Sequence, residues 1–148
     1  MASNASTTAG TVFAVSVGVP ATYDATGFAA KTYTAVGDVS EMGEYGAEYA
    51  LVTFTPLATR VVQKYKGSVN YGALAIQMAL YRSDAGQTIL DAASVSDASY
   101  SFKITHQDGS DDYFTGKVMS FKTNVGAADN IKMASVAIEV DSAQVPVA

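Results

Sequence analysis

His106 is the only histidine of the 148-residue chain, which also contains no cysteine. A hydrolytic triad would have to be built around His106, with a serine nucleophile and an acid such as Asp108 or Asp112. The spacing of these residues around a predicted turn gives no support for a triad. We therefore interpret His106 as a structural residue that follows a strand, and we expect no catalytic residue and no enzymatic activity.

Carboxylates that could act in pairs occur at two places in the sequence. Asp111 and Asp112 adjoin the predicted turn, whereas Glu44 and Glu48 lie in a predicted loop, so solvation or contact with a partner explains both pairs. The stretch 108–112 (DGSDD) resembles a calcium loop only loosely, because no bidentate glutamate follows at the required spacing. No glycine-rich stretch precedes a helix that could hold a phosphate. We expect neither a metal site nor a cofactor.

The composition favours a surface that partners cover. Charged residues make up 16% of the chain and hydrophobic residues 49%, whereas an ordinary soluble protein has about 25% charged residues. A small monomer needs surface charge to stay apart from its copies, so this composition indicates contacts with partners. The net charge of -5 argues against a nucleic-acid-binding surface, which needs clustered lysine and arginine.

The sequence shows no targeting or membrane signal. No lysine or arginine precedes the apolar run Val12–Pro20, which makes the N-terminus a poor signal peptide and favours a cytoplasmic origin. No uncharged apolar run reaches the 18 or more residues that indicate a membrane-spanning helix. We therefore expect a soluble protein that does not associate with membranes.

Alternating β-branched and aromatic residues, separated by turn residues, predict a single domain over 1–148 with about seven strands. The predicted strands are Thr11–Val19, Lys31–Ser40, Thr59–Gly67, Val69–Leu80, Ser99–Gln107, Asp112–Thr123 and Ile131–Asp141. Asp108-Gly109 predicts a hairpin turn between the fifth and sixth strands. One helix is predicted over Ala85–Ala93, with Asp84 as its N-cap and Gln87 completing a capping box.

Two further features concern contacts between chains. In Val69–Leu80, every second residue from Leu74 to Leu80 is large and apolar, whereas the opposite face is mostly alanine and allows a neighbouring chain to approach closely. Residues 41–57 are predicted to form a long loop, which is too apolar to be a solvated disordered segment and is expected to dock onto a partner. The tails 1–10 and 142–148 are small and mostly uncharged, so we predict flexible or extended arms.

The order of these features carries a resemblance to a known family. An acidic segment GDVSEMGEYG precedes a long loop, a basic strand, a short helix and the hairpin YSFKITHQDG…YFTGKVMSFKTNVG. The chain thereby resembles the tail tube (major tail) proteins of long-tailed, non-contractile bacteriophages. The resemblance is strongest over 37–66 and 84–126, and the hairpin is its most specific part.

The resemblance implies a sandwich or barrel-like pair of sheets flanked by one helix. It also implies hexameric rings that stack into a hollow tube, in which one sheet of each subunit joins a continuous inner barrel. DNA would pass along the lumen without specific binding, and an acidic wall would let it slide. The implied partners are copies of the chain, a tape-measure protein and tail-tip or terminator proteins, in a virion tail assembled in the host cytoplasm. An additional C-terminal immunoglobulin-like domain, present in some members, is not expected.

The resemblance also directs attention to candidate residues for contacts between subunits. Acids of the loop could pair with bases of the following strand of a neighbour, and apolar residues of the loop could anchor that contact. The candidates are Glu41, Glu44, Tyr45, Glu48, Tyr49, Phe54, Leu57, Arg60, Lys64 and Lys66. The alternative is that these charges form salt bridges within one chain.

Other functions remain open from the sequence. An inner-tube subunit of a contractile tail or of a secretion-type injection machine would share the fold and would have the same composition. A carbohydrate-binding β-sandwich or fimbrial module would need an exposed aromatic platform, a calcium site or a secretory signal. An enzyme would depend on His106 alone.

Overall fold

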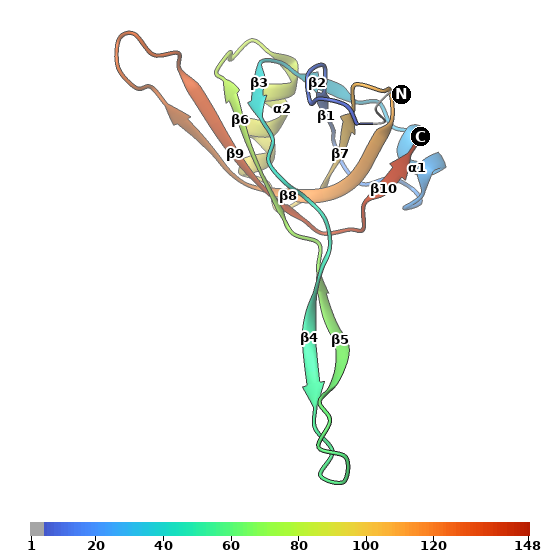
Figure 1. Ribbon diagram of the computed structural model, residues 1–148. Coiled ribbons are helices and arrows are strands. Elements are labelled where there is room, and N and C mark those ends of the chain that lie inside the picture. The colour runs from blue at the N-terminus through green and yellow to red at the C-terminus, as the bar shows by residue number, and fades with distance from the viewer. Residues whose placement is uncertain (1–4) are drawn as a thin grey trace.

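A computed structural model describes residues 5–148 and confirms the predicted mostly β fold with two sheets. The described residues form ten strands and two short helices. Figure 1 shows a curved sheet that forms the body of the molecule and a two-stranded arm that projects away from it. In chain order the elements are β1 (Val12–Ser16), α1 (Ala25–Ala29), β2 (Thr34–Val36), β3 (Val39–Glu41), β4 (Glu48–Phe54), β5 (Gln63–Asn70), β6 (Ala73–Ala79), α2 (Ala85–Ser94), β7 (Tyr100–Thr105), β8 (Asp111–Asn124), β9 (Met133–Val140) and β10 (Val145–Val147).

The main sheet is antiparallel, with strand order β2-β1-β7-β8-β9-β6-β3 and with β10 beside β8. Strands β2 and β3 lie at opposite edges of this order, although only Gly37 and Asp38 separate them in the chain. The sheet must therefore curl until its two edges come close, as in a partly closed barrel. Asp38 has a φ of 59°, a left-handed conformation that suits this sharp turn.

Large apolar side chains fill the inside of the curled sheet. Leu74, Ile76 and Met78 of β6 are each at most 1% exposed and alternate with exposed neighbours, which confirms the predicted alternation in this strand. The ring of Phe102 stacks on Phe13 and Phe114 at centroid distances of 5.7 and 5.4 Å. Burial of one such side chain contributes about 1.5–3 kcal/mol to stability.

Helix α2 covers the inside of the sheet and is hydrogen-bonded to the turn between β2 and β3. Asp84 caps the helix as predicted, because its Oδ2 accepts hydrogen bonds from Gln87 N (3.0 Å) and Gly37 N (3.2 Å). The predicted capping box is wrong, since the Gln87 side chain does not return to Asp84. Its Nε2 donates to the carbonyls of Gly37 and Ala79, and its Oε1 accepts from Tyr81 N. A buried glutamine thus joins the helix to the turn between β2 and β3 and to the end of β6.

The structure corrects the predicted loop at 41–57. Its second half is strand β4, which pairs with β5 to form the projecting arm. The predicted break between strands at residue 68 is also wrong, since β5 continues to Asn70 and the chain turns at Gly72. Gly72 has a φ of +87°, and a Cβ there would lie 2.9 Å from the carbonyl oxygen of Gly46. Glycine is therefore required at this turn, because the backbone is left-handed and leaves no room for a side chain.

Other boundaries differ for local reasons. The predicted strand Lys31–Ser40 is divided into β2 and β3 by the turn at Asp38. The C-terminal arm contains β10, which is held by three paired positions with β8, and helix α1 was not predicted. Of the predicted N-terminal arm, residues 1–4 lie outside the described residues, and 5–10 form no strand. No helix within 5–148 has the length and apolar character needed to cross a bilayer.

Candidate functional site in the projecting hairpin

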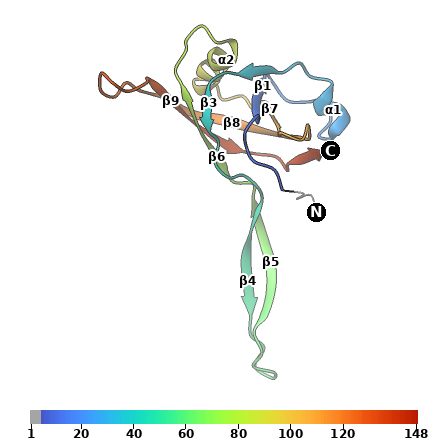
Figure 2. The same cartoon turned by 45° about the horizontal axis from the view of Figure 1, so that its top comes forward.

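The hairpin of β4 and β5 stands away from the body of the molecule (Figure 2). Every residue of β4 is exposed, and in β5 only Gly67 is partly buried. An isolated two-stranded hairpin is marginally stable in water, and three strands or a packed face are normally needed. The hairpin therefore presents two open faces on which another protein can pack.

Strand register divides the side chains of the hairpin between these faces. The pair Val52 and Tyr65 lies on one face, and the pair Leu51 and Lys66 lies on the other. A bulge beside Ala50 shifts the register between Tyr49 and Leu51. Gly67 lies against Val52, and a Cβ at Gly67 would approach Val52 Cγ2 to 2.7 Å. The uncharged face comprises Ala50, Val52, Phe54, Gln63, Tyr65 and Gly67, and the lysine face comprises Tyr49, Leu51, Thr53, Lys64, Lys66 and Val69.

Both faces expose large apolar side chains. Phe54 and Tyr65 on the uncharged face are 60% and 54% exposed, and Leu51 on the lysine face is 67% exposed. Soluble monomers rarely expose a continuous apolar patch of this kind, and such patches mark interaction sites. The hairpin has the composition of a surface that becomes buried between other chains.

The tip of the hairpin is a defined turn and not a disordered end. Arg60 N donates a hydrogen bond to Pro56 O at 2.9 Å, and Arg60 has a φ of 55°. A left-handed residue other than glycine costs about 1–2 kcal/mol, and strained residues of this kind cluster at binding sites. The turn presents Leu57 with 97% of its surface exposed.

Charge is segregated along the hairpin. Glu41, Glu44 and Glu48 lie at its base or lead into it, whereas Lys66 lies opposite Leu51 midway along the strands and Lys64 and Arg60 lie closer to the tip. The ion pairs within 5–148 are His106–Asp112 and Lys117–Asp141, so the predicted alternative of salt bridges within this set does not form in the described chain. The Lys66 ammonium instead lies 4.7 Å from the centre of the Tyr49 ring.

Tyr45 differs from the other candidates because it packs into its own chain. Its hydroxyl donates to Asp112 Oδ2, and its ring lies 5.8 Å from that of Phe114. His106 Nε2 contacts the same carboxylate oxygen at 2.6 Å. Burial raises the pKa of Asp112, but hydrogen bonds from Tyr45, His106 and Gln144 outweigh it and hold this pKa below its ordinary value. Burial and the bond to Asp112 raise the pKa of Tyr45.

This cluster anchors the base of the hairpin to the body. Tyr45 precedes β4 by three residues, whereas Asp112 lies 67 residues further along the chain at the start of β8. His106 thus has a partner that also holds the hairpin, as a structural residue would. Among residues 5–148, no group of three or more histidine and acidic side chains is arranged to hold a metal ion.

The sequence missed several residues of the hairpin faces. Leu51, Val52 and Tyr65 were not selected, although all are about half exposed or more. The alternation of residues 48–54 could have revealed a strand, but three glutamates and two glycines nearby favoured a loop. Tyr65 lies in the predicted strand Thr59–Gly67, for which the sequence alone predicts no face.

Comparison with known proteins identifies the fold. No family model matches the sequence, and no curated protein does. The structure is similar to a chain of the six-fold symmetrised anti-feeding prophage (AFP) baseplate, with a TM-score of 0.70 and 7% identity over 99% of this chain and 97% of that one. It is also similar to the SPP1 tail tube (TM-score 0.61, 12% identity, 93% and 76% covered).

A third similar structure is the sheath/tube terminator of an extracellular contractile injection system, PVC (TM-score 0.65, 8% identity, 93% of both chains covered). At these identities the likeness establishes the fold and nothing finer. The chain therefore has a fold that occurs in tail tubes, tube terminators and baseplates.

Proposed function

We propose that this protein is a structural subunit that assembles with copies of itself into stacked rings, which form the hollow tube of a phage tail. The observation that carries the proposal is the projecting hairpin, which exposes large apolar side chains on both faces and bears charges that form no ion pair within the described residues. A hairpin of this kind needs a partner on each side. The tail-tube-like fold supports a copy of the same chain as that partner.

The charge pattern suggests how two copies align. Arg60 and Lys64 lie toward the tip of one hairpin and Lys66 lies midway along it, and the base of the next copy offers acids that form no ion pair within the described residues. Pairing outer half to base joins different patches on the two copies, which is a heterologous contact that propagates into rings or filaments. Each apolar face would become buried in the same step.

Closure of a ring would use an unpaired strand edge in the main sheet. Strand β7 pairs with β8 only as far as Gly116, and beyond it Lys117–Asn124 pairs only with β9. An eight-residue free edge invites pairing with another chain. We infer that this edge meets a strand edge of the adjacent subunit, so that β8, β9 and β6 of each copy continue an inner barrel.

The outer face of these strands would then line the bore through which DNA passes. Small residues predominate on its β6 and β9 strands, but β8 adds Lys117 opposite Glu139 and Lys122 opposite Ser135. These strands carry no excess of acids, so acids at the hairpin base and in the loops would have to supply a negative lumen. A tape-measure protein inside the tube and terminator proteins at its ends would be the remaining partners.

A second candidate is the tube of a contractile injection system. The similarities to the baseplate and the tube terminator support it as much as the similarity to the phage tube supports the first proposal. Both candidates require self-assembly, and they differ in whether a contractile sheath surrounds the tube.

Sedimentation velocity at rising concentration tests the shared step. We expect monomers to give way to ring-sized or longer species as concentration increases. A protein that remains monomeric at every concentration, and that binds sugars on a glycan array, would contradict the proposal and support a carbohydrate-binding module.

A further inference from the structure

The curled sheet is not closed at one place, and a cavity remains there. The cavity has a volume of about 320 Å³ and lies between β3 with its following residues on one side and the end of β7 on the other. Its lining includes Val39, Glu41, Met42, Tyr45, Ile104 and His106. At about 30 Å³ for each water molecule, the cavity has room for a branched apolar side chain.

The floor and rim of this cavity differ in character. Ile104 at the floor is fully buried, and Val39 and Met42 are partly buried against the hydrophobic core. Glu41 at the rim is exposed and has no ion-pair partner within the described residues. An apolar floor beside a free carboxylate fits a ligand with an apolar side chain and a cation close together.

The hairpin tip has this combination. Leu57 is the most exposed large apolar residue of the described chain, and Arg60 lies three residues later in the same hydrogen-bonded turn. Since the turn is already formed, binding would order few additional bonds. In one molecule the tip points away from the body that contains the cavity (Figure 1), so it can reach such a cavity only in another copy.

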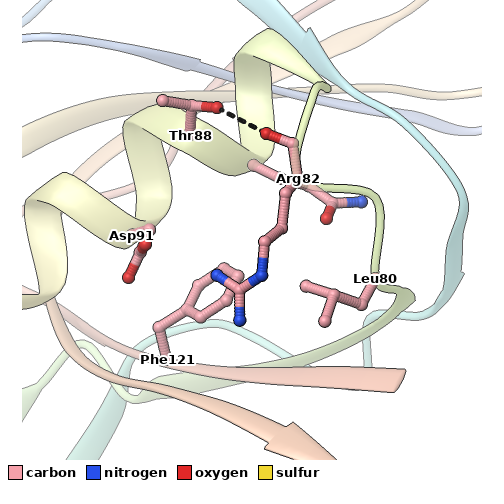
Figure 3. Close-up of a pocket in the computed structure, with 6 residues that line it drawn as sticks. Leu80, Arg82, Thr88, Asp91 and Phe121 are labelled. Atoms are coloured by element: carbon pink, nitrogen blue, oxygen red, sulfur yellow. Dashed lines mark hydrogen bonds between the residues drawn. The ribbon is translucent and has the colours of Figure 1, made fainter. Parts of the chain in front are cut away.

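A second cavity differs from the first in the charged residues that line it. It has a volume of about 210 Å³ and lies between α2, the end of β6 and β8. Figure 3 shows the Arg82 side chain extended across it, beside Phe121. Arg82 and Asp91 both line this cavity, so its formal charges balance, whereas Glu41 lines the first cavity without a lysine or arginine beside it. The second cavity therefore serves as the control.

We propose that Leu57 at the hairpin tip of one copy inserts into the cavity between β3 and β7 of a second copy, with Arg60 paired to Glu41. This inference rests on the proposed self-assembly and names the surface that receives the hairpin. It places Arg60 at the tip of one hairpin beside Glu41 near the base of the hairpin in the other copy, in agreement with the charge pattern along the hairpin. Loss of the Leu57 side chain should raise the concentration at which assembly begins by about ten- to one-hundredfold.

Disulfide trapping between two variants tests the contact directly, because the natural chain has no cysteine. Leu57→Cys is mixed with Ser40→Cys, which places a thiol at the lining of the proposed cavity. The control mixture pairs Leu57→Cys with Thr88→Cys at the second cavity. A disulfide requires Cα atoms within about 7 Å, and a hetero-disulfide in a mixture can form only between chains.

We expect the first mixture to give a covalent heterodimer in assembled material and the control mixture to give none. Assembled material that yields only the control heterodimer, or neither, would overturn this inference and leave self-assembly intact. If no variant and no natural protein assembles, the proposed function fails together with it.

A charge exchange provides a second test. Arg60→Glu should raise the concentration needed for assembly about tenfold or more, and Glu41→Arg in the same chain should restore it. If the double variant assembles no better than either single variant, Arg60 and Glu41 do not meet across the contact. Both residues are exposed, so each variant is expected to fold.

Discussion

Replacement of Tyr49 and Phe54 by serine separates folding from assembly. Tyr49 lies on the lysine face and Phe54 on the uncharged face, and they are 51% and 60% exposed. Neither belongs to the hydrophobic core, so the double variant should lose less than about 1 kcal/mol of unfolding free energy. Part of that loss reflects the contact of Tyr49 with Lys66, which is worth about 0.5–1 kcal/mol at an exposed site.

The cost to assembly should be much larger. An aromatic side chain of about 200 Å² has about 100–120 Å² still to bury at these exposures. At about 25 cal/mol per Å², the two residues together account for an upper bound of about 5 kcal/mol per subunit. If half of this is realised, the concentration at which assembly begins rises by about two orders of magnitude.

Thermal unfolding of the monomer and sedimentation velocity measure the two effects separately. Tyr81→Ser is the matched control, because Tyr81 is 59% exposed but lies outside the hairpin. We expect the control to assemble as the natural protein does. A double variant that unfolds, or one that assembles at the natural concentration, would refute the reasoning.

Three further predictions concern the body of the molecule. Gln87→Leu should lower the free energy of unfolding by about 2–4 kcal/mol, because it removes three part-buried hydrogen bonds from the side chain to the backbone. A urea midpoint equal to that of the natural protein would contradict this. Gly86→Ala should be destabilising by about 2 kcal/mol or more, because the new Cβ would lie 2.4 Å from Ala35 O; unchanged thermal unfolding would show that α2 does not pack directly on β2. Asp112 has a pKa below its ordinary 3.8 in the folded chain, so its ionised form stabilises the fold above about pH 4 and this contribution is lost as pH falls through the folded pKa. Acid unfolding of Asp112→Asn should therefore depend less steeply on pH, and an identical profile would argue against the Tyr45–Asp112–His106 cluster.

The parts of the fold that sequence patterns predicted are those with strong local signals. Strict alternation placed β6 with its apolar face inward, and Asp108-Gly109 located the turn between β7 and β8. Asp84 preceded a clear apolar stripe, which located α2. Each of these signals is carried by residues close together in the chain.

What the sequence did not reveal depends on distant contacts. The hairpin strand β4 has no buried face, so burial periodicity could not distinguish it from a loop. The partner of Tyr45 lies 67 residues away, and this placed Tyr45 among the candidates for contacts between chains. Strand β10 is only three residues long and depends on pairing with β8.

Negative-stain electron microscopy of the purified protein at rising concentration tests the central claim most directly. The account predicts hollow tubes or stacked rings of uniform width, which disappear in the Tyr49 and Phe54 double variant. Monomers at all concentrations, or assemblies that persist unchanged in the double variant, would contradict the claim that the hairpin builds a tube.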